Sequence, residues 1–281
     1  MSPLCESFLT EEQLSSMEPF YPLVVYVCDR CFLVQLEEFV PGEEIFREYA
    51  YFSSYSDTWL AHCHRYSREM IRRFDLDGDS LVVEVASNDG YLLQYFQEAG
   101  VPCLGIEPAR NVAAFAEQKG IQTITEFFGL DLASELVEKG VRPDLLTGKN
   151  VLAQVHDLND FVRGLKKLLA EDGTVTIEFP HLLRLIAENQ FDTIYHEHFS
   201  YFSFISVEMI FAAHGLRIFD VEEFPTHGGS LRIYACHEEE ERTVSPAVSE
   251  LRAREEDEGV GTLAYYDRFD EQVKETKRGL L

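Results

Sequence analysis

The chain has 281 residues and a formal net charge of −26 at pH 7, from 50 acidic and 24 basic side chains. That balance excludes a general affinity for nucleic acid, whose phosphate backbone is bound by Lys and Arg. No apolar run approaches the ~20 residues of a membrane span, and Met1–Thr10 lacks the basic and apolar regions of a signal peptide. We therefore expect a soluble, cytoplasmic protein without membrane partners.

The N-terminal segment, residues 1–45, carries the pattern of half a zinc ribbon. Cys28 and Cys31 form a C-x-x-C motif between two strand-like runs. A structural zinc ion needs four ligands, usually from two such pairs, and upstream there is only Cys5. We expect a partial zinc-ribbon-like segment and leave zinc binding at Cys28 and Cys31 open.

Residues 46–78 are predicted to form a helical lead-in, and strands then alternate with helices. Buried strand-like runs at Ser80–Ala86, Pro102–Ile106 and Thr174–Phe179 are separated by helix-like segments. Alternation of this kind predicts a parallel, doubly wound α/β sheet. We assign it to residues 79–240.

The end of the chain has a different pattern. Arg217–Phe224 and Ser230–His237 are two strand-like runs, which predict an antiparallel hairpin closing the sheet. Residues 241–281 are highly charged and are expected to form a helical tail.

The turn after the first sheet strand predicts a nucleotide site. Glu84 lies in that strand, Gly90 precedes a helix, and Glu107 follows the second strand. Ligands of doubly wound folds bind at these strand ends, where an acid can accept both ribose hydroxyls. The turn lacks G-x-G-x-x-G, which favours S-adenosylmethionine (SAM) over NAD. The alternative interpretation is two surface acids at strand ends.

An aromatic loop after the fifth strand contains the sequence Tyr195-His196-Glu197-His198. H-x-H could ligate a metal, but zincin-type hydrolases use H-E-x-x-H on a helix. His and Tyr facing the ligand crevice suit acid–base work at neutral pH. The alternative is a packing loop with solvated histidines. A second candidate, His227-Gly228, is either a ligand contact or a hairpin turn.

Four segments carry a family resemblance: EVASNDGYLL, GIEPARNVAAFA, FDTIYHEHFSYFS and THGGSLRIYA. Together they resemble the SAM-dependent nucleotide-sugar C-methyltransferases, including those that act on dTDP-4-keto-deoxysugars in deoxysugar biosynthesis. The resemblance implies a class I SAM-methyltransferase Rossmann-like fold. Compared with that family, the chain is expected to lack the first zinc-ligand pair and the C-terminal domain.

The resemblance also implies a reaction. A base removes the proton from the carbon next to the keto group, and the resulting enolate takes the methyl group of SAM. His198 is then the expected base, and Tyr195 and Glu197 orient it or hydrogen-bond the sugar. The family also uses a tyrosine ahead of the SAM domain. Tyr51 is our catalytic candidate there, with Tyr49 and Tyr55 left as substrate-binding.

The remaining expected contacts follow from the same resemblance. The SAM site is predicted to comprise Glu84, Ser87, Asn88, Gly90, Glu107 and Asn150. The nucleotide-sugar, the expected small-molecule partner, is predicted to contact His181, Arg184, His196, His227 and Gly228.

Three other functions are weighed against this one. A SAM-dependent O- or N-methyltransferase of a small metabolite explains the sheet but not the YHEH loop. A catalytically impaired scaffold on the same fold explains the missing domains but not the retained Glu107. An NAD-dependent sugar oxidoreductase is disfavoured by the absent glycine fingerprint.

Overall fold

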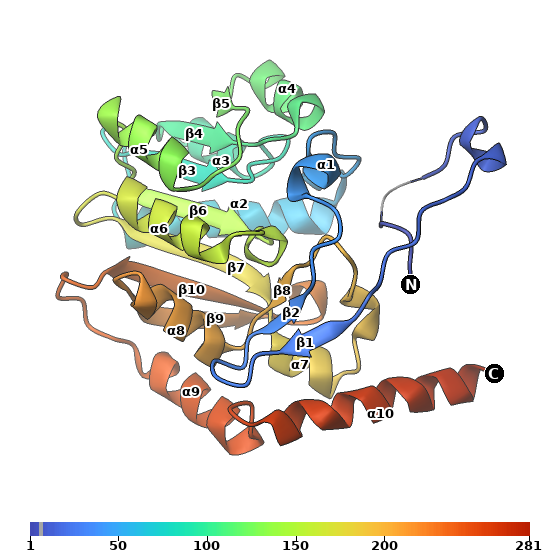
Figure 1. Ribbon diagram of the computed structural model, residues 1–281. Coiled ribbons are helices and arrows are strands. Elements are labelled where there is room, and N and C mark those ends of the chain that lie inside the picture. The colour runs from blue at the N-terminus through green and yellow to red at the C-terminus, as the bar shows by residue number, and fades with distance from the viewer. Residues whose placement is uncertain (6–7) are drawn as a thin grey trace.

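The computed structural model describes residues 1–5 and 8–281. Its centre is a seven-stranded sheet with the order β5-β4-β3-β6-β7-β10-β9, in which β10 runs antiparallel to both of its neighbours (Figure 1). The strands are β3 (Val82–Val85), β4 (Cys103–Ile106), β5 (Thr123–Ile124), β6 (Leu145–Lys149), β7 (Thr174–Pro180), β9 (Leu216–Phe224) and β10 (Ser230–His237). The sheet expected from the alternation is therefore present, with the hairpin β9–β10 at one edge.

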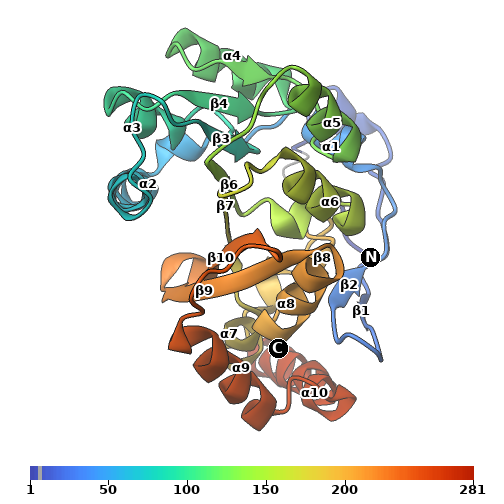
Figure 2. The ribbon, with the colours of Figure 1, turned by 90° about the vertical axis from the view of Figure 1, so that its left-hand side faces the viewer.

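Helices cover both faces of this sheet (Figure 2). One face carries α5 (Leu130–Glu138), α6 (Leu158–Leu168) and α8 (Phe204–Ala213). The other carries α2 (Asp57–Arg73) and α3 (Leu93–Glu98). The central strands are buried on both sides, as parallel strands between two helical layers are, and this explains their continuous apolar runs.

The N-terminal segment pairs with the aromatic loop that follows β7. After η1 (Gln13–Ser15), β1 (Val25–Val27) and β2 (Val34–Leu36) form a hairpin, and β2 also pairs with β8 (Ser200–Tyr201). Val34 lies opposite Tyr201 in this small sheet. The chain then runs through α1 (Gly42–Phe46) and η2 (Ser53–Tyr55) to α2. Segments far apart in sequence thus meet at the carboxyl end of the main sheet.

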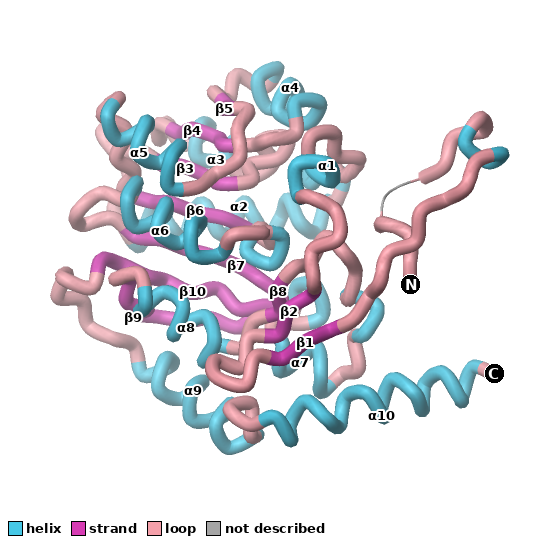
Figure 3. Tube along the Cα trace, in the orientation of Figure 1, coloured by secondary structure: helices cyan, strands magenta, loops and turns pink. Residues whose placement is uncertain are grey.

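The remaining elements are short helices and two C-terminal helices. Besides the α-helices α4 (Arg110–Gln118) and α7 (Leu182–Ala187), there are short 3-10 helices η3 (Leu152–Gln154), η4 (Phe191–Thr193) and η5 (Thr226–Gly228). The helix α9 (Pro246–Glu258) begins after a Ser245 cap and ends at the left-handed Gly259. The helix α10 (Leu263–Leu280) then extends away from the body (Figure 3). No helix in the described part of the chain is both long and apolar enough to span a bilayer.

Candidate active site

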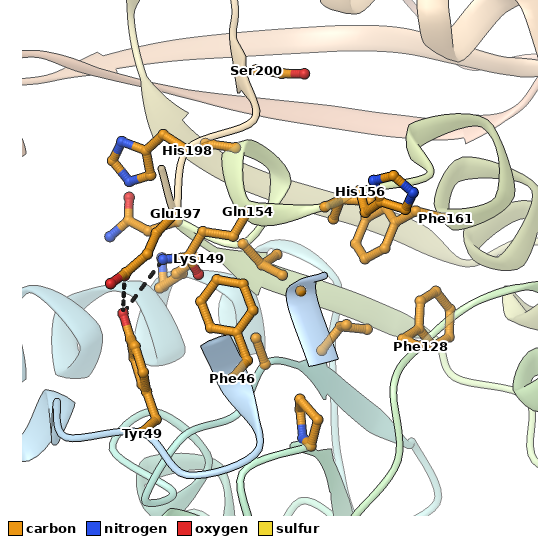
Figure 4. A pocket seen from close by; sticks show the side chains of 18 of the residues that line it. Phe46, Tyr49, Phe128, Lys149, Gln154, His156, Phe161, Glu197, His198 and Ser200 are labelled. Carbon is orange, nitrogen blue, oxygen red and sulfur yellow. Dashed lines mark hydrogen bonds between the residues drawn. The ribbon is translucent and has the colours of Figure 1, made fainter. Parts of the chain in front are cut away.

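A cavity of about 720 Å³ lies where β3, β4, β6 and β7 end, the usual ligand position in a doubly wound sheet. The loops after these strands, the segment before α2 and the YHEH loop form its walls (Figure 4). The sequence-predicted residues that line it are Tyr49, Tyr51, Asn88, Glu107, Asn150, Tyr195, Glu197, His198 and His227.

Glu107 is fixed by the loop after β3. Its carboxylate accepts hydrogen bonds from the backbone N–H groups of Asn88 and Ala109, both at 2.9 Å. Burial raises the pKa of this carboxyl to about 7, against those two hydrogen bonds, which lower it. Glu107 therefore faces the cavity as an acceptor close to half-ionised at neutral pH.

Glu84 lies in β3 behind this loop and does not line the cavity. Its carboxyl is fully buried, and neither oxygen makes a hydrogen bond of ordinary geometry. Burial raises its pKa well above the usual range, although Tyr91 and Lys149 oppose that shift. The Glu84 carboxyl is therefore buried in the sheet behind the cavity.

Two other residues expected at the cofactor also pack behind the loop. Ser87 is fully buried, and a Cβ on the facing Gly105 would lie 2.4 Å from its Oγ. Gly90 has φ +76°, and a Cβ there would lie 2.4 Å from Ile121. Both positions hold the loop against its neighbours, and neither reaches the cavity.

Asn150 follows β6 in the left-handed region, with φ 57°. Its backbone N–H donates to the carbonyl of Glu178 at 2.7 Å, which ties the end of β6 to β7. Its side-chain Oδ1 is buried without a hydrogen-bond partner, although the residue lines the cavity. This carbonyl oxygen is therefore available to a donor on a ligand.

The imidazole of His198 is held in one tautomer. Its Nδ1 lies 3.1 Å from the Thr193 carbonyl oxygen, which only accepts, so Nδ1 carries the hydrogen. Its Nε2 then accepts from the Tyr195 hydroxyl at 2.9 Å. Burial lowers the pKa of His198 to about 4, so the ring is neutral at physiological pH. A neutral imidazole with a lone pair on Nε2 has the form of a general base.

The tyrosines ahead of α2 are placed by Asn111 of α4 and by Asn88 of the loop after β3. The backbone of Tyr49 exchanges two hydrogen bonds with the Asn111 side chain, at 3.1 and 2.7 Å. Asn88 donates to the Tyr51 carbonyl and accepts from the Ser53 N–H. This arrangement brings Tyr49 and Tyr51 to the cavity.

Tyr55 lies outside this arrangement, with its side chain stacked on Phe52 and 81% exposed. The structure therefore separates the three tyrosines that sequence reasoning left together.

The Tyr49 hydroxyl reaches the YHEH loop. It donates to Glu197 Oε2 at 3.1 Å, and Gln154 Nε2 lies 3.5 Å from it (Figure 4). Burial, with a further contribution from Glu197, raises the pKa of Tyr49 far above its usual value. Tyr49 is therefore a neutral hydrogen-bond donor that links the N-terminal segment to the loop of His198.

Four residues expected at the nucleotide-sugar lie away from the cavity. The Nε2 of buried His181 lies 2.7 Å from Glu255 of α9. Arg184 lies on the surface near Glu223. His196 Nε2 donates to the carbonyl of Pro22, and Gly228 forms the β9–β10 turn.

Sequence reasoning missed a buried ionic network under the cavity. Glu178 of β7 contacts Lys149 Nζ at 2.7 Å, His62 Nε2 at 2.8 Å and Arg232 Nη2 at 3.0 Å. Burial by itself raises the pKa of Glu178, but the charges of Lys149 and Arg232 and the hydrogen bond with His62 outweigh it and hold the pKa well below its usual range. The one available signal was an acid inside the apolar strand run Thr174–Phe179.

Sequence reasoning also missed several cavity-lining residues that carry no motif. They are Trp59, Glu126, Phe127, Phe128, Lys149, Gln154 and Phe161.

The C-x-x-C motif lies in the turn between β1 and β2, remote from the cavity. Backbone N–H groups of Cys31 and Arg30 lower the pKa of Cys28, and burial raises that of Cys31. Within residues 1–5 and 8–281, no three His, Cys, Asp or Glu side chains are grouped as metal ligands. Two thiols supply half of the ligands of a tetrahedral zinc site.

Three family models match the chain. Residues 1–46 match a family described as "Putative zinc binding domain". Residues 49–221 match a methyltransferase domain, and residues 225–281 match a C-methyltransferase C-terminal domain.

Two known proteins show how far this similarity extends. The chain is 34% identical to C-methyltransferase NovU of Streptomyces niveus over 287 residues, covering 100% of this chain and 68% of NovU. Magnesium protoporphyrin IX methyltransferase from Synechocystis PCC 6803, solved with bound SAH, is 17% identical with a TM-score of 0.50, over 63% of this chain and 83% of that one. The second likeness concerns the fold alone and, with the methyltransferase-domain match, confirms the class I SAM-methyltransferase fold.

The family matches overturn one expectation from the sequence. The chain was expected to lack the first zinc-ligand pair and the C-terminal domain of its family. Both the N-terminal zinc-binding domain and the C-terminal domain are present, because residues 1–46 match the former and residues 225–281 match the latter. Cys28 and Cys31 remain the one C-x-x-C pair of the sequence. The error arose from judging the N-terminal domain by its cysteine count and the C-terminal domain by its expected length.

Proposed function

Because this chain belongs to the C-methyltransferase family of NovU, we propose that it methylates the carbon next to the keto group of a dTDP-4-keto-deoxysugar, at C-3. The chain is a SAM-dependent C-methyltransferase. Family membership therefore disfavours the two alternative functions, an O- or N-methyltransferase and a catalytically impaired scaffold. The sugar and the carbon are the proposal. One observation carries it: a neutral imidazole, whose Nε2 accepts a hydrogen bond from Tyr195, lines the same cavity as Glu107.

The cavity residues fit SAM. Glu107 offers carboxylate acceptors for the ribose hydroxyls, and the unpartnered Oδ1 of Asn150 offers an acceptor for the amino group. Phe127 and Phe128 line the part of the cavity reached after β5, where a flat base can pack. When bound, SAM supplies an electrophilic methyl group on its sulfonium.

The residues of the YHEH loop account for the proton chemistry of this proposal. His198 Nε2 takes the proton from C-3, and the Thr193 carbonyl stabilises the resulting imidazolium through Nδ1–H. Tyr195, which donates to Nε2 before the sugar enters, turns its hydroxyl to the keto oxygen and stabilises the enolate. Tyr49 and Glu197, hydrogen-bonded to one another, orient the sugar beside His198.

The proposal is tested by incubating the protein with SAM and a dTDP-4-keto-6-deoxy sugar. We expect mass spectrometry to show one methyl group replacing one hydrogen, and NMR to place it on C-3. In D₂O without SAM, deuterium should enter the same carbon, because the base acts before the methyl group is transferred. A methyl group on oxygen, with no deuterium at carbon, would contradict the proposal.

The titration of Glu107 predicts a pH dependence of SAM binding. Its raised pKa, about 7, means that the carboxyl is protonated below that pH and loses acceptor capacity for the ribose. We expect the affinity for SAM to rise about tenfold from about pH 6 to about pH 8, as linkage to one group requires. Calorimetric titration checks this, and Glu107→Gln should bind weakly without that slope. An equal slope in the variant would assign the titration elsewhere.

A further inference from the structure

The charges around the cavity are strongly unequal. Among the described residues that line it, Lys149 is the one lysine or arginine. The carboxylates that line it are Glu38, Glu43, Glu107, Glu126, Asp157, Asp160 and Glu197. A ligand that brings a negative group into this cavity therefore has a single cation to meet it.

We propose that the Lys149 ammonium binds the α-carboxylate of SAM and so selects the intact amino acid tail of the methyl donor. This role rests on SAM as the methyl donor and does not depend on the identity of the sugar. Lys149 would act as a specificity-determining residue of the donor site. The chain would recognise both charges of the tail with two consecutive residues at the end of β6.

The position of Lys149 supports this pairing. Lys149 is the last residue of β6, and the preceding residue, Gly148, pairs with Val85 at the end of β3. The loop that follows Val85 contains Asn88, whose backbone N–H binds the Glu107 carboxylate. Asn150, the next residue, presents a buried Oδ1 that has no hydrogen-bond partner. The ammonium and carboxylate of SAM are attached to one carbon, so adjacent residues offering an acceptor and a cation match both.

The Lys149 ammonium has more hydrogen-bond donors than its one hydrogen bond in the structure uses. Its side chain is 1% exposed, and the structure shows one hydrogen bond from Nζ, to Glu178 at 2.7 Å. The ring of Tyr66 lies 3.9 Å from Nζ and the ring of Trp59 lies 5.9 Å away. Since an ammonium has three donors, it can keep Glu178 and still reach a carboxylate in the cavity.

The Glu178 carboxylate has other partners besides Lys149. The same carboxylate is already bonded to Arg232, through Nε at 3.2 Å and Nη2 at 3.0 Å, and to His62. Glu178 instead orients the lysine along the cavity wall. A charge-assisted hydrogen bond in such a dry site contributes about 1.5–3 kcal/mol, or roughly ten- to a hundredfold in affinity.

The test compares SAM with decarboxylated SAM, which lacks only the carboxylate. Trp59 is the single tryptophan of the sequence and lines the cavity, so its fluorescence reports binding of each ligand without any sugar or turnover. We expect the wild type to prefer SAM by at least about tenfold. Lys149→Met should lose that preference while binding decarboxylated SAM within about threefold of the wild type.

Two further variants make the result specific. Lys119 donates to the backbone oxygen of Asp89 in the loop after β3 but does not line the cavity, so Lys119→Met should keep the preference. Lys149→Arg, which retains the charge, should keep most of it, and Lys149→Gln serves if the methionine variant does not fold. A wild type without preference, or a Lys149 variant that retains it, would overturn the proposal.

Discussion

Replacement of His198 by alanine is expected to lower kcat by about a hundred- to ten-thousandfold, the usual contribution of a general base. The imidazole has its Nε2 lone pair in the cavity and its Nδ1 fixed on the Thr193 carbonyl. Alanine removes the imidazole to which the proposed mechanism assigns proton removal. Binding of SAM should change little, because the predicted SAM contacts lie after β3, β4 and β6.

The matched control is His196, two residues earlier in the same loop. Its Nε2 donates to the Pro22 carbonyl and its ring does not line the cavity, so His196→Ala should keep kcat within about threefold. Turnover and deuterium entry at C-3 are measured on both variants. Full turnover by His198→Ala with normal SAM binding would remove His198 from the role.

The pKa of His198 also predicts the pH at which kcat/KM begins to fall on the acidic side of its pH profile. Burial lowers that pKa to about 4, so the ring remains a base well below the usual histidine value of about 6.5. At saturating SAM, kcat/KM for the sugar should therefore fall only as the pH approaches about 4. A limb near 6.5 would mean that a group other than His198 sets the rate.

The order of elements could be predicted from sequence because their patterns are local. Apolar strand runs separated by helices predicted the doubly wound sheet, and two runs near the end predicted the hairpin β9–β10. The carboxyl ends of parallel strands share one edge of the sheet, which is why Glu107 and the YHEH loop were expected in one crevice. Both line the same cavity.

Side-chain direction could not be predicted, because distant residues decide it. His181 follows β7 and was expected at the substrate, but Glu255, 74 residues later, holds its imidazole. Tyr49 and Tyr55 looked equivalent until Asn111, 62 residues from Tyr49, placed one of them at the cavity. Lys149 carried no motif, and its contact with Glu178 arises only when β6 pairs with β7.

Glu178→Ala is expected to destabilise the fold by about 3–5 kcal/mol, the typical cost of removing one partner from a buried ion pair. The carboxylate contacts Lys149, His62 and Arg232, and its side chain is 1% exposed. Its removal leaves buried cations without their shared anion. Thermal and urea unfolding measure the loss, which corresponds to roughly 10 °C in melting temperature.

An exposed ion pair provides the contrast. Asp270 and Lys274 are paired one turn apart on α10, with both side chains more than half exposed. Asp270→Ala should therefore change stability by less than about 0.5 kcal/mol. A similar small loss for Glu178→Ala would mean that the buried network is not coupled to folding.

The acid dependence of stability distinguishes lost charge from lost packing at Glu178. Its pKa is held well below the ordinary glutamate value, so its stabilisation is complete above that value, about 4.3, and is lost as the pH falls below it. Wild type and Glu178→Gln should thus differ most above about pH 5 and converge in acid, because protonation of Glu178 then produces the same neutral group. Glutamine preserves the shape of the side chain, so a difference that persisted unchanged in acid would assign the loss to packing. Convergence would show that the charge of the Glu178 carboxylate, rather than its packing, accounts for the stability it contributes with Lys149, His62 and Arg232.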